Sequence, residues 1–173
     1  MKKGHKRKSH EHRKDLAGEF KWGDTLQLVF IVVFFIGLAF DLIFFKLSNS
    51  WQELLPWYYR LVVSLFLLFA AVYFGLKSHK IMFEEEREKL MVIDKDVYSR
   101  VRHPMYFSSI LAYLSFVILS LSVVSILIFF VVIIFYYYLC YYEEQVLIDK
   151  LGNEYRSYMK KVPMLFPSFR KKL

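Results

Sequence analysis

The sequence predicts an all-α integral membrane protein: a bundle of about four transmembrane helices with a cytoplasmic C-terminal helix. Hydrophobic residues make up 57% of the 173-residue chain and charged residues 23%, and the two kinds are separated along it. The apolar stretches are unbroken runs such as LVFIVVFFIGLAF. Unbroken runs indicate helices surrounded by lipid or protein, whereas the strands of a membrane β-barrel alternate in polarity. The pattern excludes an ordinary soluble domain and a disordered chain.

Four apolar stretches are candidates for membrane spans. They cover about residues 25–47, 57–76, 106–121 and 123–142. A helix rises ~1.5 Å per residue, so about 20 residues cross the ~30 Å hydrocarbon core, and the third stretch is short by this measure. One helix over 106–142 would be too long for a single span. We therefore expect a hairpin that reverses near Ser120-Leu121-Ser122.

The distribution of positive charge predicts the topology. Lys and Arg number eight in residues 1–22, seven in 77–104 and seven from residue 143 onward. The connection 48–55 contains none. By the positive-inside rule, the N-terminus, the middle connection and the C-terminus are cytoplasmic, and the protein is multi-pass.

These features predict five segments along the chain. They are a basic cytoplasmic arm (1–24), two transmembrane helices (25–76), a cytoplasmic connection (77–105), a transmembrane hairpin (106–142) and a cytoplasmic C-terminal segment (143–173). We expect residues 77–91, which are good helix formers, to extend the second helix or to form a surface helix. Asp41 lies near the outer end of the first span, where we expect it to snorkel toward the interface, and Arg60 is expected to be an interfacial anchor.

Two groups of polar residues flank the predicted hairpin. They are Arg102, His103, Pro104 and Tyr106 at its start, and Glu143 and Glu144 at its end. Because a hairpin returns to the face from which it started, both groups should meet at the cytoplasmic face. A proline suits the first turn of a helix, whose free N–H groups attract anions, and two carboxylates attract cations. The arrangement predicts either a site for one ligand with an anionic and a cationic end, or ordinary interfacial charges.

The same region resembles a known family. In order, it contains Val97-Tyr98-Ser99-Arg100-Val101-Arg102-His103-Pro104-Met105-Tyr106, an apolar hairpin, Glu143-Glu144-Gln145-Val146-Leu147, Leu151-Gly152-Asn153-Glu154-Tyr155-Arg156-Ser157-Tyr158 and Val162-Pro163. This set resembles the C-terminal half of the isoprenylcysteine carboxyl methyltransferases, a family within a wider group that includes membrane phospholipid N-methyltransferases. The resemblance covers about residues 90–167 and implies S-adenosylmethionine as the cofactor. The carboxylate and ammonium of that molecule agree with the charge arrangement above.

The resemblance also implies roles for individual residues. His103, Pro104, Tyr106, Glu143 and Glu144 would form the cofactor pocket, with the glutamates at its cationic end and the start of the third helix at its anionic end. Residues 143–173 would complete this pocket.

Further roles follow from the same resemblance. Arg102 and Arg156 would orient an acceptor carboxylate, and no metal is expected. Tyr155 and Tyr158 would pack the C-terminal helix beneath the pocket.

Three positions depart from the family pattern. The family often has Gly where this chain has Asp96 and Ser108, and Asn where it has Ser122. A bulkier residue at a position of close backbone approach would narrow the cofactor pocket.

The sequence therefore predicts a membrane-embedded S-adenosylmethionine-dependent methyltransferase. Its acceptor would be lipid-tailed or prenylated, and carboxyl O-methylation of an isoprenylcysteine-like substrate is favoured. The alternatives are a phospholipid amine N-methyltransferase, a non-catalytic membrane scaffold of the same fold, or a sterol-type NADPH reductase. Membrane lipids are expected partners. Nucleic acid is not, because topology explains the net charge of +8.

Overall fold

A computed structural model describes residues 22–45, 52–53, 55–84 and 90–167, and regular structure in these ranges is helical throughout. Most of the predicted basic arm lies outside the described residues. The longer elements are α1 (Gly23–Phe40), α3 (Trp57–His79), α4 (Pro104–Ser120), α5 (Val123–Leu151) and α6 (Asn153–Lys161). Short π-helical turns, Asp41–Phe45 and Lys80–Glu84, extend α1 and α3, and a 3₁₀ turn covers Asp96–Ser99.

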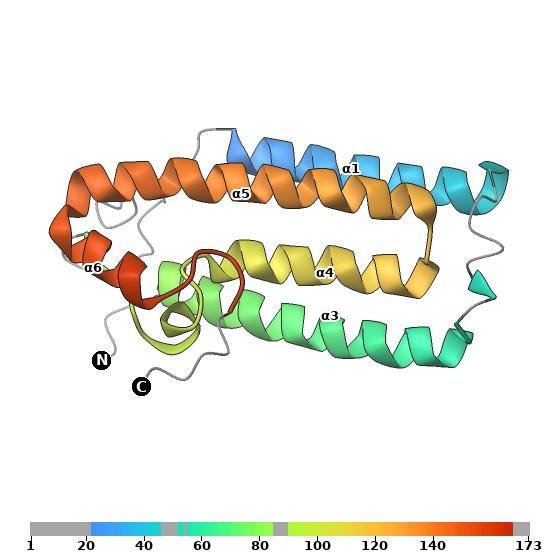
Figure 1. The fold of residues 1–173 in the computed structure, drawn as a ribbon, viewed down its shortest axis with the longest axis horizontal. Coiled ribbons are helices and arrows are strands. Elements are labelled where there is room, and N and C mark those ends of the chain that lie inside the picture. Colours follow the sequence, from blue (N-terminus) through green and yellow to red (C-terminus); the bar gives the residue numbers. More distant parts are fainter. Residues whose placement is uncertain (1–21, 46–51, 54, 85–89, 168–173) are drawn as a thin grey trace, which may run out of the picture.

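The four long helices form two layers. Figure 1 shows α1 beside α5 in one layer and α3 beside α4 in the other, and these are the pairs that pack along each other. The ends of α3 and α5 and the starts of α1 and α4 lie at the same end of the bundle, where α6 crosses it (Figure 1). This end therefore brings together segments that are far apart in the sequence.

The exterior of the bundle is apolar. Among the described residues, three helical segments are long and apolar enough to cross a membrane: Gly23–Phe44, Trp57–Phe83 and Val123–Leu151. Large side chains on them lie exposed, such as Phe66 at 72% and Phe69 at 74%. Such a surface would be unfavourable in water, and it fits a membrane protein. At 17 residues α4 is shorter than these three, as its sequence predicts.

The inner face of α4 supplies much of the main core. Ile110, Tyr113 and Val117 pack with Phe34 of α1 and Val132 of α5. The ring of Phe34 meets that of Tyr113 edge-on at 4.9 Å between centroids. This buried cluster joins α1 to the hairpin.

The predicted reversal of the hairpin is confirmed. The helix α4 ends at Ser120 and α5 begins at Val123. Leu121 turns the chain with a φ of 48°, in the left-handed region that side chains rarely adopt. Ser122 caps α5, since its hydroxyl accepts a hydrogen bond from the Ser125 backbone N–H at 3.2 Å. The turn forms without glycine because its polar groups are bonded locally.

The expectation that Asp41 snorkels to the interface is wrong. Its side chain is fully buried, and the Ser122 hydroxyl donates a hydrogen bond to its carboxylate. Arg60 donates to the Leu119 carbonyl at 3.1 Å, and Gln52 donates to that of Ser120 at 3.0 Å. Asp41, Gln52 and Arg60 thus bond polar groups at the hairpin tip, and the Ser122 hydroxyl holds the Asp41 side chain against the turn.

Two helices extend beyond their predicted ends. The second helix continues through His79 and the turn Lys80–Glu84, as one of the two interpretations of this segment predicts. The hairpin helix α5 does not end near residue 142 but runs to Leu151, and Gly152 ends it with a φ of 58°. The residues after 142 are good helix formers, so nothing stops α5 before that glycine. Glu143 and Glu144 therefore lie on the side of a helix rather than at its end.

Candidate functional site

A cavity of about 600 Å³ lies at the end of the bundle where α6 crosses it. Its walls come from the start of α1, the end of α3, residues 90–93, the start of α4, the last turns of α5, and α6. This volume is in the range of ligand pockets in proteins.

The segment before α4 is held by the end of the chain. The N–H groups of Arg102 and His103 donate to the carbonyls of Pro163 (2.9 Å) and Met164 (3.2 Å). Pro104 occupies the first position of α4, and no side chain from the described parts of the chain caps this helix start. The start of α4 therefore faces the cavity with the positive end of its helix dipole.

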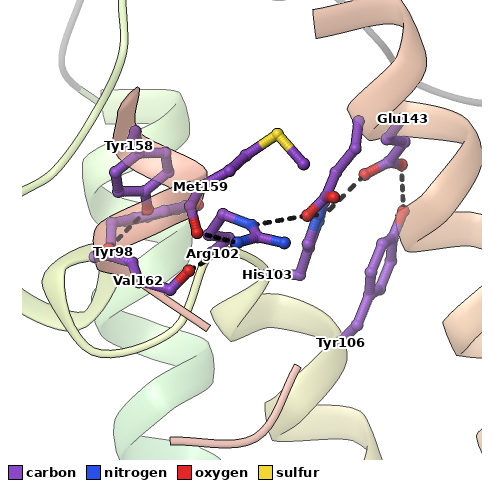
Figure 2. Close-up of polar contacts among 9 residues, drawn as sticks. Tyr98, Arg102, His103, Tyr106, Glu143, Tyr158, Met159 and Val162 are labelled. Atoms are coloured by element: carbon purple, nitrogen blue, oxygen red, sulfur yellow. Dashed lines mark hydrogen bonds and ion pairs between the residues drawn. The ribbon is translucent and has the colours of Figure 1, made fainter. Parts of the chain in front are cut away.

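Glu144 is the centre of a buried ionic cluster. Its Oε1 accepts hydrogen bonds from Arg102 Nε at 2.6 Å and His103 Nε2 at 3.2 Å, and the residue is only 3% exposed. The same guanidinium donates through Nη1 to the carbonyls of Met159 (2.9 Å) and Val162 (2.6 Å), as Figure 2 shows. Arg102 thus joins α5 to the last turn of α6.

Glu143 occupies a different place. It lines the cavity, whereas Glu144 does not. Its carboxylate lies 3.4 Å from His103 Nδ1 and accepts a hydrogen bond from the Tyr106 hydroxyl (Figure 2). The rings of His103 and Tyr106 lie nearly parallel, 5.8 Å apart. A carboxylate fixed by a phenol and an imidazole is thereby presented to the cavity.

His103 carries a proton more readily than an ordinary histidine. Burial by itself would lower its pKa, but hydrogen bonds and charge interactions with Glu143 and Glu144 outweigh this effect and raise the pKa above 6.5. The two carboxylates therefore favour the protonated form of the His103 imidazole.

The structure brings most of the site residues implied by the resemblance to one place. Arg102, His103, Pro104, Tyr106 and Glu143 all line the cavity, and Glu144 lies directly behind it.

The structure leaves Arg156 apart from this group. It lies on the exposed face of α6 and is not among the residues that line the cavity. We therefore leave Arg156 out of the site proposed below.

The expected packing role of Tyr155 and Tyr158 is confirmed. Both side chains are buried in a small core with Val162, and both line the cavity. The Tyr158 hydroxyl donates to the Tyr98 carbonyl at 2.5 Å (Figure 2). The two tyrosines fix α6 against the segment that leads into α4.

The two glycine departures have a structural basis. Asp96 has a φ of 52°, in the left-handed region where glycine costs least, and its carboxylate pairs with Lys77 at 3.2 Å. Ser108 donates a hydrogen bond to the Ala71 carbonyl of α3 at 2.9 Å. The room for it comes from Gly75, where a Cβ would approach Ser108 Oγ to 2.8 Å. In this chain the glycine that permits the close approach lies on α3 instead of α4.

Sequence reasoning missed the contributions of α1 and α3 to the cavity. Asp24 and Gln27 of α1 and His79 of α3 line it. The predicted topology could have indicated this contribution. It places the start of the first span and the end of the second span at the same membrane face as the two ends of the hairpin. The sequence, however, indicated neither the order of packing nor the rotation of these helices.

Comparison with known proteins agrees with this assembly. A family model for phospholipid methyltransferases matches residues 58–154, which include all but the first residue of α3, all of α4 and α5, and both glutamates. Searches of curated proteins and of solved structures found no match. The family match covers more than half of the chain, including the parts of α4 and α5 that line the cavity around His103 and Glu143, so the protein belongs to the phospholipid methyltransferase family.

Proposed function

We propose that the protein transfers a methyl group from S-adenosylmethionine to the polar headgroup of a lipid-tailed acceptor at the membrane surface. The family implies a membrane methyltransferase with a donor of this type. The single observation that carries the proposal for this chain is the presentation of Glu143 to a 600 Å³ cavity beside the uncapped start of α4.

The residues present suit the charges of such a donor. Its methionine part has an ammonium, for which Glu143 is a partner on the cavity wall, and a carboxylate, for which the α4 start is a partner. When bound, the donor supplies a methyl group on a positively charged sulfur. Glu144 supports this site from behind, because it holds Arg102 and His103 in position.

Catalysis needs no covalent nucleophile from the protein. Methyl transfer is an in-line displacement, so the main task of the cavity walls is to hold acceptor and donor in line. Tyr106 and His103 contribute by fixing the Glu143 carboxylate. If the acceptor is an ammonium, it must first lose a proton, and the cavity offers the carboxylates of Asp24 and Glu143 and the imidazoles of His79 and His103 in their neutral form as acceptors.

The family match supports an amine acceptor and a carboxylate acceptor equally. A carboxylate would need a cation, and Arg102 is the residue expected to provide it. That guanidinium lines the cavity but already bonds Glu144 and two backbone carbonyls. This engagement favours the amine, so we place phospholipid-type N-methylation ahead of carboxyl O-methylation.

Isothermal titration calorimetry in detergent tests the donor site. We expect wild-type protein to bind S-adenosylmethionine and Glu143→Gln to bind it about 10- to 100-fold more weakly, the worth of one charged hydrogen bond. Glu154→Gln, an exposed glutamate on α6, is the matched control and should bind like wild type. Absence of binding to wild type, or stabilisation by NADPH instead, would refute the proposal.

Transfer of a radiolabelled methyl group identifies the acceptor chemistry. A methyl ester is released by mild base, whereas a methylated amine is stable. A base-stable product in extracted lipids is the expected result, and a base-labile product would favour the carboxylate.

A further inference from the structure

The first turn of α1 forms a wall of the cavity that the family match does not include. The match begins at residue 58, whereas Asp24 and Gln27 both line the cavity. What this wall recognises must therefore be argued from its own chemistry.

Asp24 gives this wall a negative charge. Of the other groups that line the cavity, Arg102 is paired with Glu144, and His103 contacts both glutamates. None of the ion pairs formed within the described part of the chain uses Asp24. Its carboxylate therefore remains to attract a cation and to repel an anion that enters the cavity.

Gln27 connects this wall to the donor side. The Tyr136 hydroxyl donates to Gln27 Oε1 at 3.5 Å, at the long end for a hydrogen bond. The Tyr136 ring lies 5.3 Å from that of Tyr106, whose hydroxyl is bonded to Glu143. Two tyrosines thus lead from the α1 wall to the carboxylate proposed for the donor.

We infer that Asp24 and Gln27 form the binding site for the acceptor headgroup, and that Asp24 makes the site selective for an ammonium over a carboxylate. This inference rests on the proposed function, because it assigns the acceptor side of the same cavity. The apolar exterior of α1 next to this wall suits the tail of such an amphiphile.

A purely structural role for Asp24 makes a different prediction. An acidic residue in the first turn stabilises a helix through its dipole, and Asp24 is in the first turn of α1. That role would change thermal stability but not the preference between two ligands with the same tail. The experiment must therefore measure selectivity.

The test uses the full chain in neutral maltoside micelles with two probes, dodecylamine and dodecanoate, at pH 7. Equilibrium binding of each probe is measured with S-adenosylmethionine present. We expect wild type to prefer the amine by about tenfold or more, and Asp24→Asn to lose about tenfold in amine affinity while its donor affinity is unchanged. Gln27→Leu, which keeps the charge, should weaken amine binding by a smaller factor.

Asp149→Asn is the matched control, since Asp149 is an exposed aspartate on α5 outside the cavity. Wild-type selectivity in Asp24→Asn would overturn the inference, as would an equal loss in Asp149→Asn, which would indicate a general charge effect. Failure of the proposed function looks different: the donor does not bind wild type, whatever the dodecylamine result.

Discussion

Replacement of Glu144 by glutamine tests the clamp between α5 and α6. The substitution keeps the size of the side chain but removes its charge. In the structure one carboxylate oxygen, Oε1, receives Arg102 Nε at 2.6 Å and His103 Nε2 at 3.2 Å. The side chains of Glu144, Arg102 and His103 are 4%, 9% and 7% exposed, so solvent can replace little of what is lost.

The expected cost follows from these contacts. A hydrogen bond to a charged group contributes about 1.5–3 kcal/mol, and breaking a buried ion pair from one side costs about 3–5 kcal/mol. The amide oxygen of glutamine can still accept one bond, which favours the lower end, about 3 kcal/mol. For a chain of this size, that loss lowers the melting temperature by about 6–12 °C.

Thermal unfolding in detergent, followed by circular dichroism, measures this change. Glu154→Gln on the exposed face of α6 is the control and should melt within about 2 °C of wild type, since surface substitutions shift stability by about 0.5 kcal/mol or less. A double-mutant cycle with Arg102→Met should give a coupling energy of about 2 kcal/mol or more. If Glu144→Gln has the same melting temperature as wild type, or if the coupling energy is near zero, the contact between Arg102 and Glu144 does not stabilise the protein as its geometry indicates.

Three further predictions concern proton linkage and backbone geometry. Because the pKa of His103 is raised, the protein without donor should lose stability as pH rises above 6.5 and through that raised pKa, which melting from pH 6 to 9 checks. Affinity for the donor should increase as the imidazolium, which competes with the donor for Glu143, loses its proton. Calorimetry checks this increase from about pH 6 to 7.5, below the pKa of the donor's own α-ammonium. Asp96→Gly should melt higher than Asp96→Ala by the equivalent of about 1 kcal/mol, because only glycine relieves the left-handed φ, and equal melting would contradict this. Gly75→Ala should destabilise the α3–α4 contact, and the double variant with Ser108→Gly should recover stability; no recovery would show that the two positions do not clash.

The level of the site along the bundle axis could be predicted from the sequence, because this level depends only on the position of the turn between the two hairpin helices. Both helices of a hairpin rise ~1.5 Å per residue, so residues equally far from the turn lie at the same level. A reversal at Leu121 puts His103 level with residue 139, about one helical turn before Glu143 and Glu144, without any knowledge of packing. The structure agrees, with contacts of 3.4 Å and 3.2 Å between the imidazole and the two carboxylates.

The rotation of the helices could not be predicted in the same way. Adjacent residues on a helix point about 100° apart, so Glu143 and Glu144 leave α5 in different directions, although both side chains reach the His103 ring. A chain that is apolar on all sides gives no periodic signal for which face turns inward. The sequence therefore did not indicate that Glu143 lines the cavity while Glu144 is buried against Arg102, nor that Asp24 lines the same cavity. The same reason explains the wrong expectation for Asp41, because its partner Ser122 lies in the turn between α4 and α5 and not in α1.

The unequal lengths of α4 and α5 explain why a cavity exists at this end of the bundle. At ~1.5 Å per residue, the 17 residues of α4 span about 25 Å and the 29 residues of α5 about 43 Å. The same turn ends α4 and begins α5, so the last turns of α5 extend beyond the start of α4. These turns have no α4 surface to pack against. The segment before α4, and α6 with its buried tyrosines, cover this overhang instead, and the Arg102–Glu144 pair joins them to it. Segments that cover an overhang from the side leave space beneath it, and the cavity beside Glu143 occupies this space.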